Sequence, residues 1–193
     1  LMIMRFKIIL LFLSLLISIP SKAQYSFNVK RSYGETGHQI YSVSYSREGD
    51  YIVSIGYDNS IIIWNAESGI IYRTLGGLKK RPLAAVISIA KDLCASGGED
   101  NMITLWDLKT ANVITTLAGI KGNIKALDIS TDGKYLAAGG SDRIIRIWDT
   151  DSKNLVFELK RHKSDVNALQ FSADGKMLVS VGGDKMLCLS LIH

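Results

Sequence analysis

The sequence contains few of the residues on which catalytic and metal sites usually depend. Only two cysteines and three histidines occur among its 193 residues. There is no Cys-x-x-Cys pair, Gly-x-Ser-x-Gly elbow, Walker loop or His-Glu-x-x-His motif. Acidic turns such as "EDN" at residues 99–101 offer fewer ligands than calcium requires. These absences predict a protein that is not an enzyme and has no catalytic residues, no metal and no cofactor.

The sequence also has little excess of charge of one sign. Lysine and arginine number 23 against 18 acidic residues, which gives a net charge of +5. Removal of residues 1–23 takes away Arg5, Lys7 and Lys22 but no acid, and lowers the net charge to +2. Basic and aromatic residues are not interleaved as they are in many nucleic-acid-binding proteins. We therefore expect no nucleic acid partner.

The one long hydrophobic run lies near the start of the sequence. Two basic residues precede apolar residues 8–19, and residues 21–23 have small side chains at both positions that a signal peptidase reads. This pattern is typical of a secretory signal peptide over residues 1–23, with Gln24 as the mature N-terminus. A membrane anchor is the alternative, but the apolar core is shorter than the roughly 20 residues needed to span a bilayer. The expected location is therefore secreted or periplasmic, with no stable membrane span after cleavage.

The rest of the sequence repeats with a constant step. The stretch "SIGYDNSIIIW" at 54–64 returns as "SGGEDNMITLW" at 96–106, "AGGSDRIIRIW" at 138–148 and "SVGGDKMLCLS" at 180–190. An aspartate occurs every 42 residues, at Asp58, Asp100, Asp142 and Asp184. A fixed step of this length indicates copies of one supersecondary unit.

Each unit has the pattern of four short strands. In the third copy, apolar and polar residues alternate over 124–130, and further strand-like runs follow at 135–141, 144–149 and 155–160. Asp-Gly at 132–133 predicts a hairpin turn between the first two runs, and Asp142-Arg143 predicts the next turn. The second run is rich in Ala, Ser and Gly, which lets a neighbouring sheet approach closely.

These strands predict an all-β fold. No stretch shows helical periodicity, and a four-stranded sheet with two apolar faces must cover both of them. Identical sheets stacked around an axis do this and leave only short edges. We therefore predict a β-propeller of four-stranded antiparallel blades over residues 24–193, with four repeats of 42 residues that are a complete ring or part of a larger one.

The two cysteines do not occupy equivalent positions in the repeat. Cys94 precedes Asp100 by six residues, whereas Cys188 follows Asp184 by four. Export would permit a disulfide, but the two positions lie in different strands two repeats apart. We predict two buried free thiols.

The repeat resembles the WD repeat of the WD40 β-propeller family. "LWD" at 105–107 and "IWD" at 147–149 each follow an aspartate six residues before the tryptophan. "RHKSDVNALQFSADGKMLVSVGGD" at 161–184 is similar to the family's "GH…V…FSPDG…LASGSxD" run. The resemblance covers nearly all of residues 36–190, and it rests on four copies in register rather than on one dipeptide.

The resemblance implies a structural tetrad of buried His, Ser or Thr, Asp and Trp in each blade. No blade of this chain has the full set, because Ala138 replaces Ser in the third and Ser190 replaces Trp in the fourth. We expect the aspartates to be held by turn backbone N–H groups instead. The tetrad-like residues, all interpreted as structural, are Ser54, Asp58, Trp64, Ser96, Asp100, Trp106, Asp142, Trp148, His162, Ser180 and Asp184.

Family members mostly have about seven blades, so four units leave three interpretations open. The chain is the first half of a longer propeller, it pairs with a second copy in an eight-bladed ring, or it closes alone. Residues 27–33 align with a fourth strand that has no preceding blade, and such a strand would complete the last blade. The first interpretation is favoured, because the final "SLIH" loses the Trp-Asp pattern.

The predicted function is that of a non-enzymatic scaffold that binds a protein or peptide outside the cytoplasm. Loops between blades form one rim, whose positive charge suits an acidic partner. The binding candidates are Tyr57, Asn59, Glu99, Asn101, Arg143 and Lys185 beside the turn aspartates, and Lys79, Lys80, Arg81, Lys121, Lys160, Arg161 and Lys163 in the loops. The alternative is the propeller region of a larger exported enzyme, such as a peptidase, whose catalytic domain lies beyond residue 193.

Overall fold

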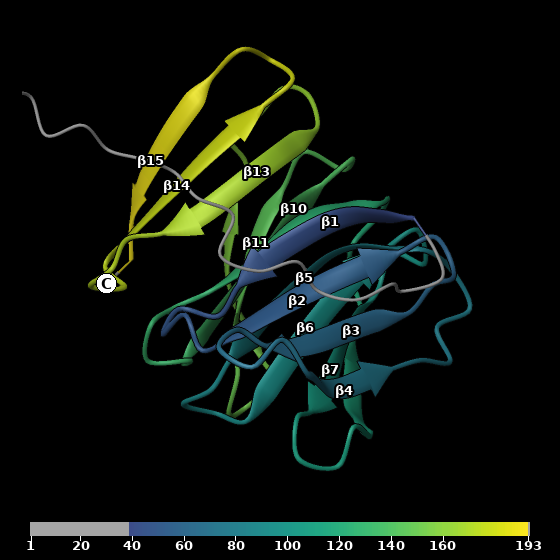
Figure 1. Ribbon diagram of the computed structural model, residues 1–193. Helices are drawn as coiled ribbons and strands as arrows, with labels where there is room; N and C mark the ends of the chain where they lie inside the picture. The colour runs from purple at the N-terminus through teal and green to yellow at the C-terminus, as the bar shows by residue number, and fades with distance from the viewer. Residues whose placement is uncertain (1–38, 193) are drawn as a thin grey trace, which may run out of the picture. The chain divides into compact units, whose positions relative to one another are not determined.

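The computed structural model describes residues 39–192, and all of these residues belong to one compact unit. They form four antiparallel sheets, the blades of a propeller, and no helix occurs among them (Figure 1). The signal peptide predicted for residues 1–23 and the strand predicted at 27–33 lie outside the described residues. Within these residues, no helix has the length and apolar character needed to cross a membrane.

Each blade is a meander of neighbouring strands. Blade 1 consists of β1 (Ile40–Tyr45), β2 (Tyr51–Gly56), β3 (Ile61–Asn65) and β4 (Ile71–Leu75). Blade 2 consists of β5 (Pro82–Ser88), β6 (Leu93–Gly98), β7 (Ile103–Asp107) and β8 (Val113–Leu117). Blade 3 consists of β9 (Ile124–Ile129), β10 (Tyr135–Gly140), β11 (Ile145–Asp149) and β12 (Leu155–Leu159). Blade 4 has three described strands, β13 (Val166–Phe171), β14 (Met177–Gly182) and β15 (Leu187–Leu191).

The strands predicted for the third repeat are confirmed to within one residue at each end. In blades 1, 3 and 4, the hairpin between the first two strands closes through a serine that directly follows the first strand. In blade 3, the Tyr135 backbone N–H donates to Ser130 Oγ at 2.8 Å, and the Gly133 N–H donates to the Ser130 carbonyl at 2.8 Å. Gly133 has a φ of 72°, a conformation that favours glycine. Asp-Gly therefore marks this turn as the sequence predicts.

The blades stack through two kinds of face. The forward face, which a blade turns toward the next one, carries apolar residues from its second and third strands. The rear face, turned toward the previous blade, carries residues of the first strand and the tryptophan of the repeat. Between blades 1 and 2, for example, Ile61 and Ile63 share a buried cluster with Ile87 and Trp106.

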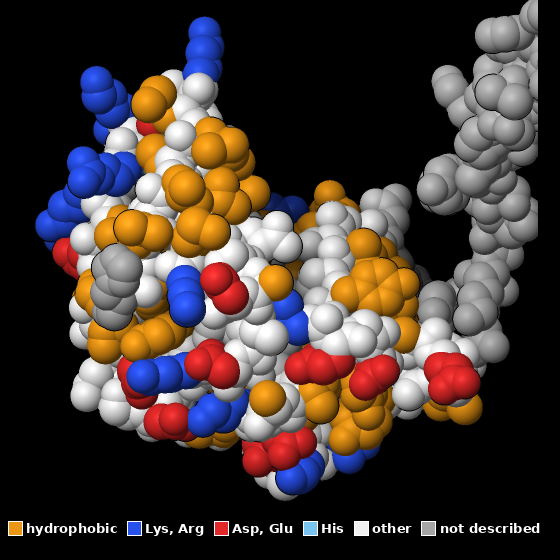
Figure 2. Space-filling view, turned by 90° about the vertical axis from the view of Figure 1, so that its left-hand side faces the viewer, with side chains coloured by type: hydrophobic (Ala, Val, Ile, Leu, Met, Phe, Trp, Pro, Cys, Tyr) orange, Lys and Arg blue, Asp and Glu red, His pale blue; other side chains and the backbone are white. Residues whose placement is uncertain are grey.

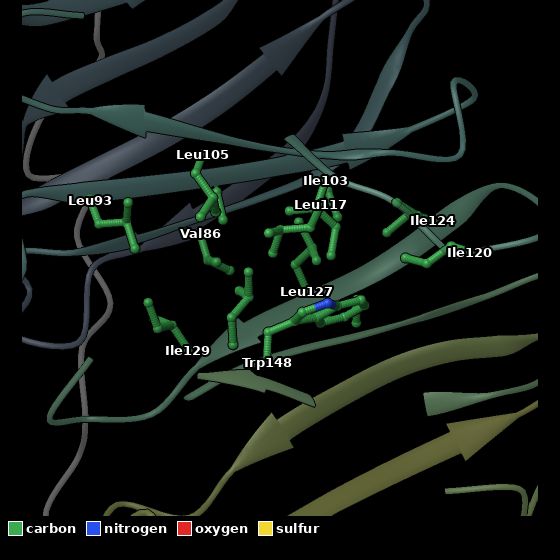
Figure 3. Close-up of a cluster of buried hydrophobic side chains, with 14 residues drawn as sticks. Val86, Leu93, Ile103, Leu105, Leu117, Ile120, Ile124, Leu127, Ile129 and Trp148 are labelled. Atoms are coloured by element: carbon green, nitrogen blue, oxygen red, sulfur yellow. The ribbon is translucent and has the colours of Figure 1, made fainter. Parts of the chain in front are cut away.

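The same arrangement recurs between the later blades. Ile103 and Leu105 of blade 2 share a cluster with Leu127, Ile129 and Trp148 of blade 3, which Figure 3 shows between the two sheets. Blade 3 in turn packs on blade 4 through a cluster that includes Ile145, Ile147, Leu169 and Phe171. The same apolar positions of the repeat therefore make all three interfaces between blades, although Ser190 replaces the tryptophan in blade 4.

Small residues in the second strands let adjacent blades approach closely. A Cβ atom added to Gly97 in β6 would lie 2.8 Å from the Ile124 side chain of the next blade. A Cβ atom on Gly139 in β10 would likewise lie 2.7 Å from the Val166 side chain. The predicted role of the small second-strand residues is confirmed, because larger side chains would force these sheets apart.

A hollow of about 690 Å³ lies between blades 1 and 4. Its walls include Tyr45 of β1 and Leu187 of β15, and the first strands of blades 2 and 3 contribute to its floor. Figure 2 shows hydrophobic side chains on both sides of a hollow in this face of the molecule. At its base, Arg47 of blade 1 pairs with Asp128 of blade 3 at 2.5 Å and donates to the Phe171 carbonyl of blade 4 at 3.2 Å.

Candidate functional site

The site is one rim of the propeller, here called the loop rim. It consists of the loops between blades, residues 76–81, 118–123 and 160–165, and the turns between the second and third strands, residues 57–60, 99–102, 141–144 and 183–186. Backbone hydrogen bonds join a loop to the turn of the same blade in blades 2, 3 and 4. They run from the N–H groups of Glu99, Ser141 and Gly183 to the carbonyls of Arg81, Asn123 and Asp165. The loops and turns therefore form one surface.

The aspartate of each turn fixes that turn. Oδ1 of Asp58, Asp100, Asp142 and Asp184 accepts the backbone N–H two residues later, at 3.1–3.3 Å. This bond holds the following residue in the left-handed region, with φ values of 63° to 69° at Asn59, Asn101, Arg143 and Lys185. Asparagine adopts this conformation at low cost, so backbone geometry alone accounts for the asparagines. Arg143 and Lys185 have no such conformational reason to occupy the position, and both are exposed.

The tetrad-like residues form a different set of bonds in each blade. In blades 1 and 2, the indole N–H groups of Trp64 and Trp106 donate to Ser54 Oγ at 2.8 Å and Ser96 Oγ at 2.9 Å. In blade 3, the methyl group of Ala138 offers Trp148 no acceptor. The three tryptophans are 3–5% exposed, and Trp106 and Trp148 belong to the buried clusters between blades.

In blade 3, the turn aspartate is paired with Arg146, a residue that the sequence analysis did not identify. The buried Arg146 in β11 pairs with Asp142 Oδ2 at 2.5 Å and with Glu158 at 3.0 Å. Arg146 lies opposite Ala138 in the sheet. The signal available in the sequence was a charged residue at the position that Ile62 and Thr104 occupy in the preceding blades.

Blade 4 brings His162, Ser180 and Asp184 together. His162 Nδ1 lies 3.1 Å from Asp184 Oδ2, and its Nε2 lies 2.9 Å from Ser180 Oγ. The Lys163 N–H donates to Asp184 Oδ2 at 2.8 Å, and this bond is the main reason why the pKa of Asp184 falls to about 2. Ser180 is 3% exposed and repeats the position of Ser54 and Ser96. Although the order of groups is that of a serine hydrolase triad, its burial and its place in the repeat fit a structural role.

An aromatic and guanidinium cluster lies where blades 1 and 2 meet on the loop rim. The Arg81 guanidinium is 5.6 Å from the Tyr57 ring centroid and 5.9 Å from that of Tyr41, and the two rings are 5.0 Å apart. Arg81 Nε also donates to Glu99 Oε1 at 3.1 Å. Tyr41 donates to the Pro82 carbonyl, and burial raises the pKa of Tyr41 to about 12. Tyr57 remains 56% exposed, so a fixed aromatic surface faces solvent.

The predicted basic residues of the rim divide into two groups. Arg81 and Lys160 are paired with Glu99 and Glu158, which offset part of their positive charge. The other basic candidates form no ion pair among the described residues. They are Lys79, Lys80, Lys121, Arg143, Arg161, Lys163 and Lys185.

Both cysteines are free thiols. Cys94 is fully buried, which raises the pKa of its thiol to about 12. Cys188 is only half-buried, because it lies on β15, the outermost described strand of blade 4. The prediction of two buried thiols is therefore right for Cys94 and wrong for Cys188.

Stacked four-stranded meanders with tryptophan and aspartate at fixed repeat positions define a β-propeller repeat protein. The family model described as "WD domain, G-beta repeat" matches residues 29–65, 111–149 and 153–189, more than half of the chain. The chain therefore belongs to the WD40 family. No curated protein sequence matches it.

The matched stretches are offset from the blades. The stretch 111–149 begins with β8 of blade 2 and continues through the first three strands of blade 3. The stretch 153–189 is divided in the same way between β12 and blade 4. These two sequence repeats therefore each contribute strands to two neighbouring blades.

Proposed function

We propose that this chain is a non-enzymatic scaffold that binds an acidic segment of a protein or peptide on the loop rim. WD40 propellers generally act as protein-interaction scaffolds and are usually not enzymes. The observation that carries the proposal is the Tyr57–Arg81 surface on a rim whose loops and turns also carry exposed cations that form no ion pair among the described residues. Tyrosine and arginine are the residues that most often dominate the binding energy of protein interfaces.

The arrangement suits an acidic partner for two reasons. Arg81 is held by Glu99 and stacked on tyrosine, so little side-chain entropy is lost when it contacts a partner. The other lysines of the loop rim supply positive charge that speeds encounter with a negatively charged segment. A tyrosine and arginine anchor with a cationic margin therefore favours a short acidic peptide that also carries an apolar side chain.

The partner is proposed to lie outside the cytoplasm. This part of the proposal rests on the basic, apolar and small-residue pattern of residues 1–23, which is that of a secretory signal peptide. Fusion of residues 1–40 to a periplasmic reporter would test it. Reporter activity that needs residues 8–19 is the expected result, and activity without them would contradict export.

Rim binding is tested with a fluorescently labelled glutamate-rich dodecapeptide that contains one leucine. The double variant Lys80→Glu, Lys121→Glu reverses two unpaired rim charges. The matched control Lys134→Glu, Lys176→Glu reverses two exposed cations in the hairpins after β9 and β13, away from the loop rim. If each exposed charge contributes about 0.7 kcal/mol, the rim variant raises Kd about tenfold.

The outcome separates rim binding from attraction to overall charge. Anisotropy titrations should give a raised Kd for the rim variant and an unchanged Kd for the control. Equal losses in both variants would show that the peptide responds only to net charge. An unchanged Kd in the rim variant would remove the loop rim as the binding site.

A further inference from the structure

The two end blades of the described chain expose apolar side chains at repeat positions that the other blades bury. On the forward face of blade 4, Leu187 is 67% and Leu189 is 63% exposed. The residues at the same repeat positions in blades 1 to 3 are at most 1% exposed. They are Ile61, Ile103 and Ile145 for Leu187, and Ile63, Leu105 and Ile147 for Leu189.

The rear face of blade 1 shows the complementary pattern. Val43 and Tyr45 are each 66% exposed. Their counterparts in blades 2 to 4 are at most 8% exposed. They are Ala85, Leu127 and Leu169 for Val43, and Ile87, Ile129 and Phe171 for Tyr45.

These two exposed faces are the halves of one interface that the chain already forms three times. Within the chain, the counterparts of Leu189 and Val43 fall in the same buried cluster at each junction, as Leu105 and Leu127 do between blades 2 and 3. Forward and rear faces of this kind therefore fit each other. At the two end blades of the described residues, the apolar side chains at these positions are instead exposed.

The two faces do not satisfy each other within one chain. The hollow between blades 1 and 4 separates them, and its walls include Tyr45 and Leu187. Both residues remain about two-thirds exposed. An exposed apolar sheet face of this kind marks a surface that another molecule covers.

We propose that a second copy of this chain covers both faces, with blade 4 of each copy stacked on blade 1 of the other. Such head-to-tail contacts close into a ring when the rotation per copy is half a turn. Two copies of four blades then give eight blades, which lies within the range known for propellers. The second copy packs between the end blades and leaves the loop rim uncovered.

Ring closure has a consequence for Arg47. This residue ties blade 1 to blades 3 and 4 across the hollow through Asp128 and the Phe171 carbonyl. An eight-bladed ring has a wider channel, so these contacts break when the two copies close. Arg47→Ala is therefore expected to strengthen the association, even though Arg47 is not on either face.

The test uses the full chain, exported and purified, with its mass measured in solution by light scattering. Two variants place opposite charges on the two faces. Leu189→Glu changes the forward face of blade 4, and Val43→Lys changes the rear face of blade 1. Both positions are exposed in the single chain, so neither substitution threatens its fold. The control is Ile114→Glu, which alters an equally apolar residue, 47% exposed, on the outer strand β8.

We expect a mass of two chains for the unaltered protein and for Ile114→Glu. Each face variant alone should give the mass of one chain, because a buried charge raises the dissociation constant about 100-fold or more. An equimolar mixture of the two face variants should recover the two-chain mass. In that mixed pair, one interface is unaltered, and the other brings the introduced glutamate of one chain beside the introduced lysine of the other.

Each other result overturns the proposal. A single-chain mass for the unaltered protein would show that the faces do not pair between copies. Aggregates of indefinite mass would show that they need further blades rather than a second copy. A two-chain mass that persists in both face variants would place the contact elsewhere. Loss of the two-chain mass in Arg47→Ala would do the same.

Discussion

Replacement of Ser96 by Ala is expected to destabilise the protein through one buried hydrogen bond. Trp106 Nε1 donates to Ser96 Oγ at 2.9 Å, and the two residues are 3% and 1% exposed. Alanine keeps the volume of the site but leaves a buried indole N–H without an acceptor. The expected loss is about 1–3 kcal/mol in the free energy of unfolding.

Blade 3 already has alanine, Ala138, at the position that Ser96 occupies in blade 2. Trp148 follows Ala138 by the same ten residues that separate Trp106 from Ser96, and the strand register is the same. Ala138→Ser therefore supplies the acceptor that blade 3 lacks. The expected gain is about 0.5–1.5 kcal/mol, the usual net value of one hydrogen bond.

Thermal unfolding followed by tryptophan fluorescence measures both changes. For a unit of this size, 1 kcal/mol shifts Tm by about 2–4 °C. Ser96→Ala should therefore lower Tm by roughly 2–12 °C, and Ala138→Ser should raise it by roughly 1–6 °C. Equal Tm values for Ser96→Ala and the unaltered protein, or a lower Tm for Ala138→Ser, would refute the view that the Trp–Ser pair stabilises a blade.

Three further predictions concern single groups. The pKa of Asp184 is lowered to about 2, so its carboxylate stabilises the folded protein fully above about pH 4, and this contribution is lost as the pH falls toward 2. The urea midpoint should therefore decline less over that pH range in Asp184→Asn than in the unaltered protein. Iodoacetamide at pH 8 should label Cys188 in the folded protein and leave the fully buried Cys94 unlabelled until urea is added. Gly140→Ala should cost about 3 kcal/mol in denaturant unfolding, because its Cβ would lie 1.9 Å from the Asn123 carbonyl oxygen.

Each of these has an outcome that would contradict it. An unchanged acid profile in Asp184→Asn would show that this carboxylate is not held more tightly in the folded state. Labelling of Cys94 at the rate of Cys188 would place Cys94 within reach of solvent. Gly76→Ala is the matched control for Gly140→Ala, since nothing lies within 4 Å of a Cβ at Gly76. A similar loss in both would rule out the close backbone approach.

The strands and their turns could be predicted because they depend on local pattern. Alternation over 124–130 and the Asp-Gly at 132–133 were sufficient to place β9, β10 and the hairpin between them. The constant step of 42 residues then carried this assignment to the other copies. One strand boundary was missed by a residue. β11 begins at Ile145 rather than Ile144, because the Ile144 backbone N–H donates to Asp142 Oδ1 and so belongs to the turn.

The position of the loop rim could be predicted from the sequence, but the contacts between its side chains could not. Arg81 and Glu99 are 18 residues apart, and their pairing depends on how the loop before β5 lies against the turn after β6. The Tyr41 ring reaches the same place only because blade 1 sits beside blade 2. Neither relation repeats along the chain, so the 42-residue step carries no signal of it.

The proposed ring bears on how the loop rim would be used. Head-to-tail stacking keeps the polarity of every blade, because the second copy is related to the first by rotation about the propeller axis. Both loop rims then lie on the same side of the ring. A partner with two acidic segments could contact both, and binding of its first segment would raise the effective concentration of the second. Such a partner should therefore lose most of its affinity for Leu189→Glu, in which each rim is intact but the two are no longer joined. A partner with one acidic segment should bind this variant and the unaltered protein equally well, so the pair of measurements separates the role of the rim from that of the ring.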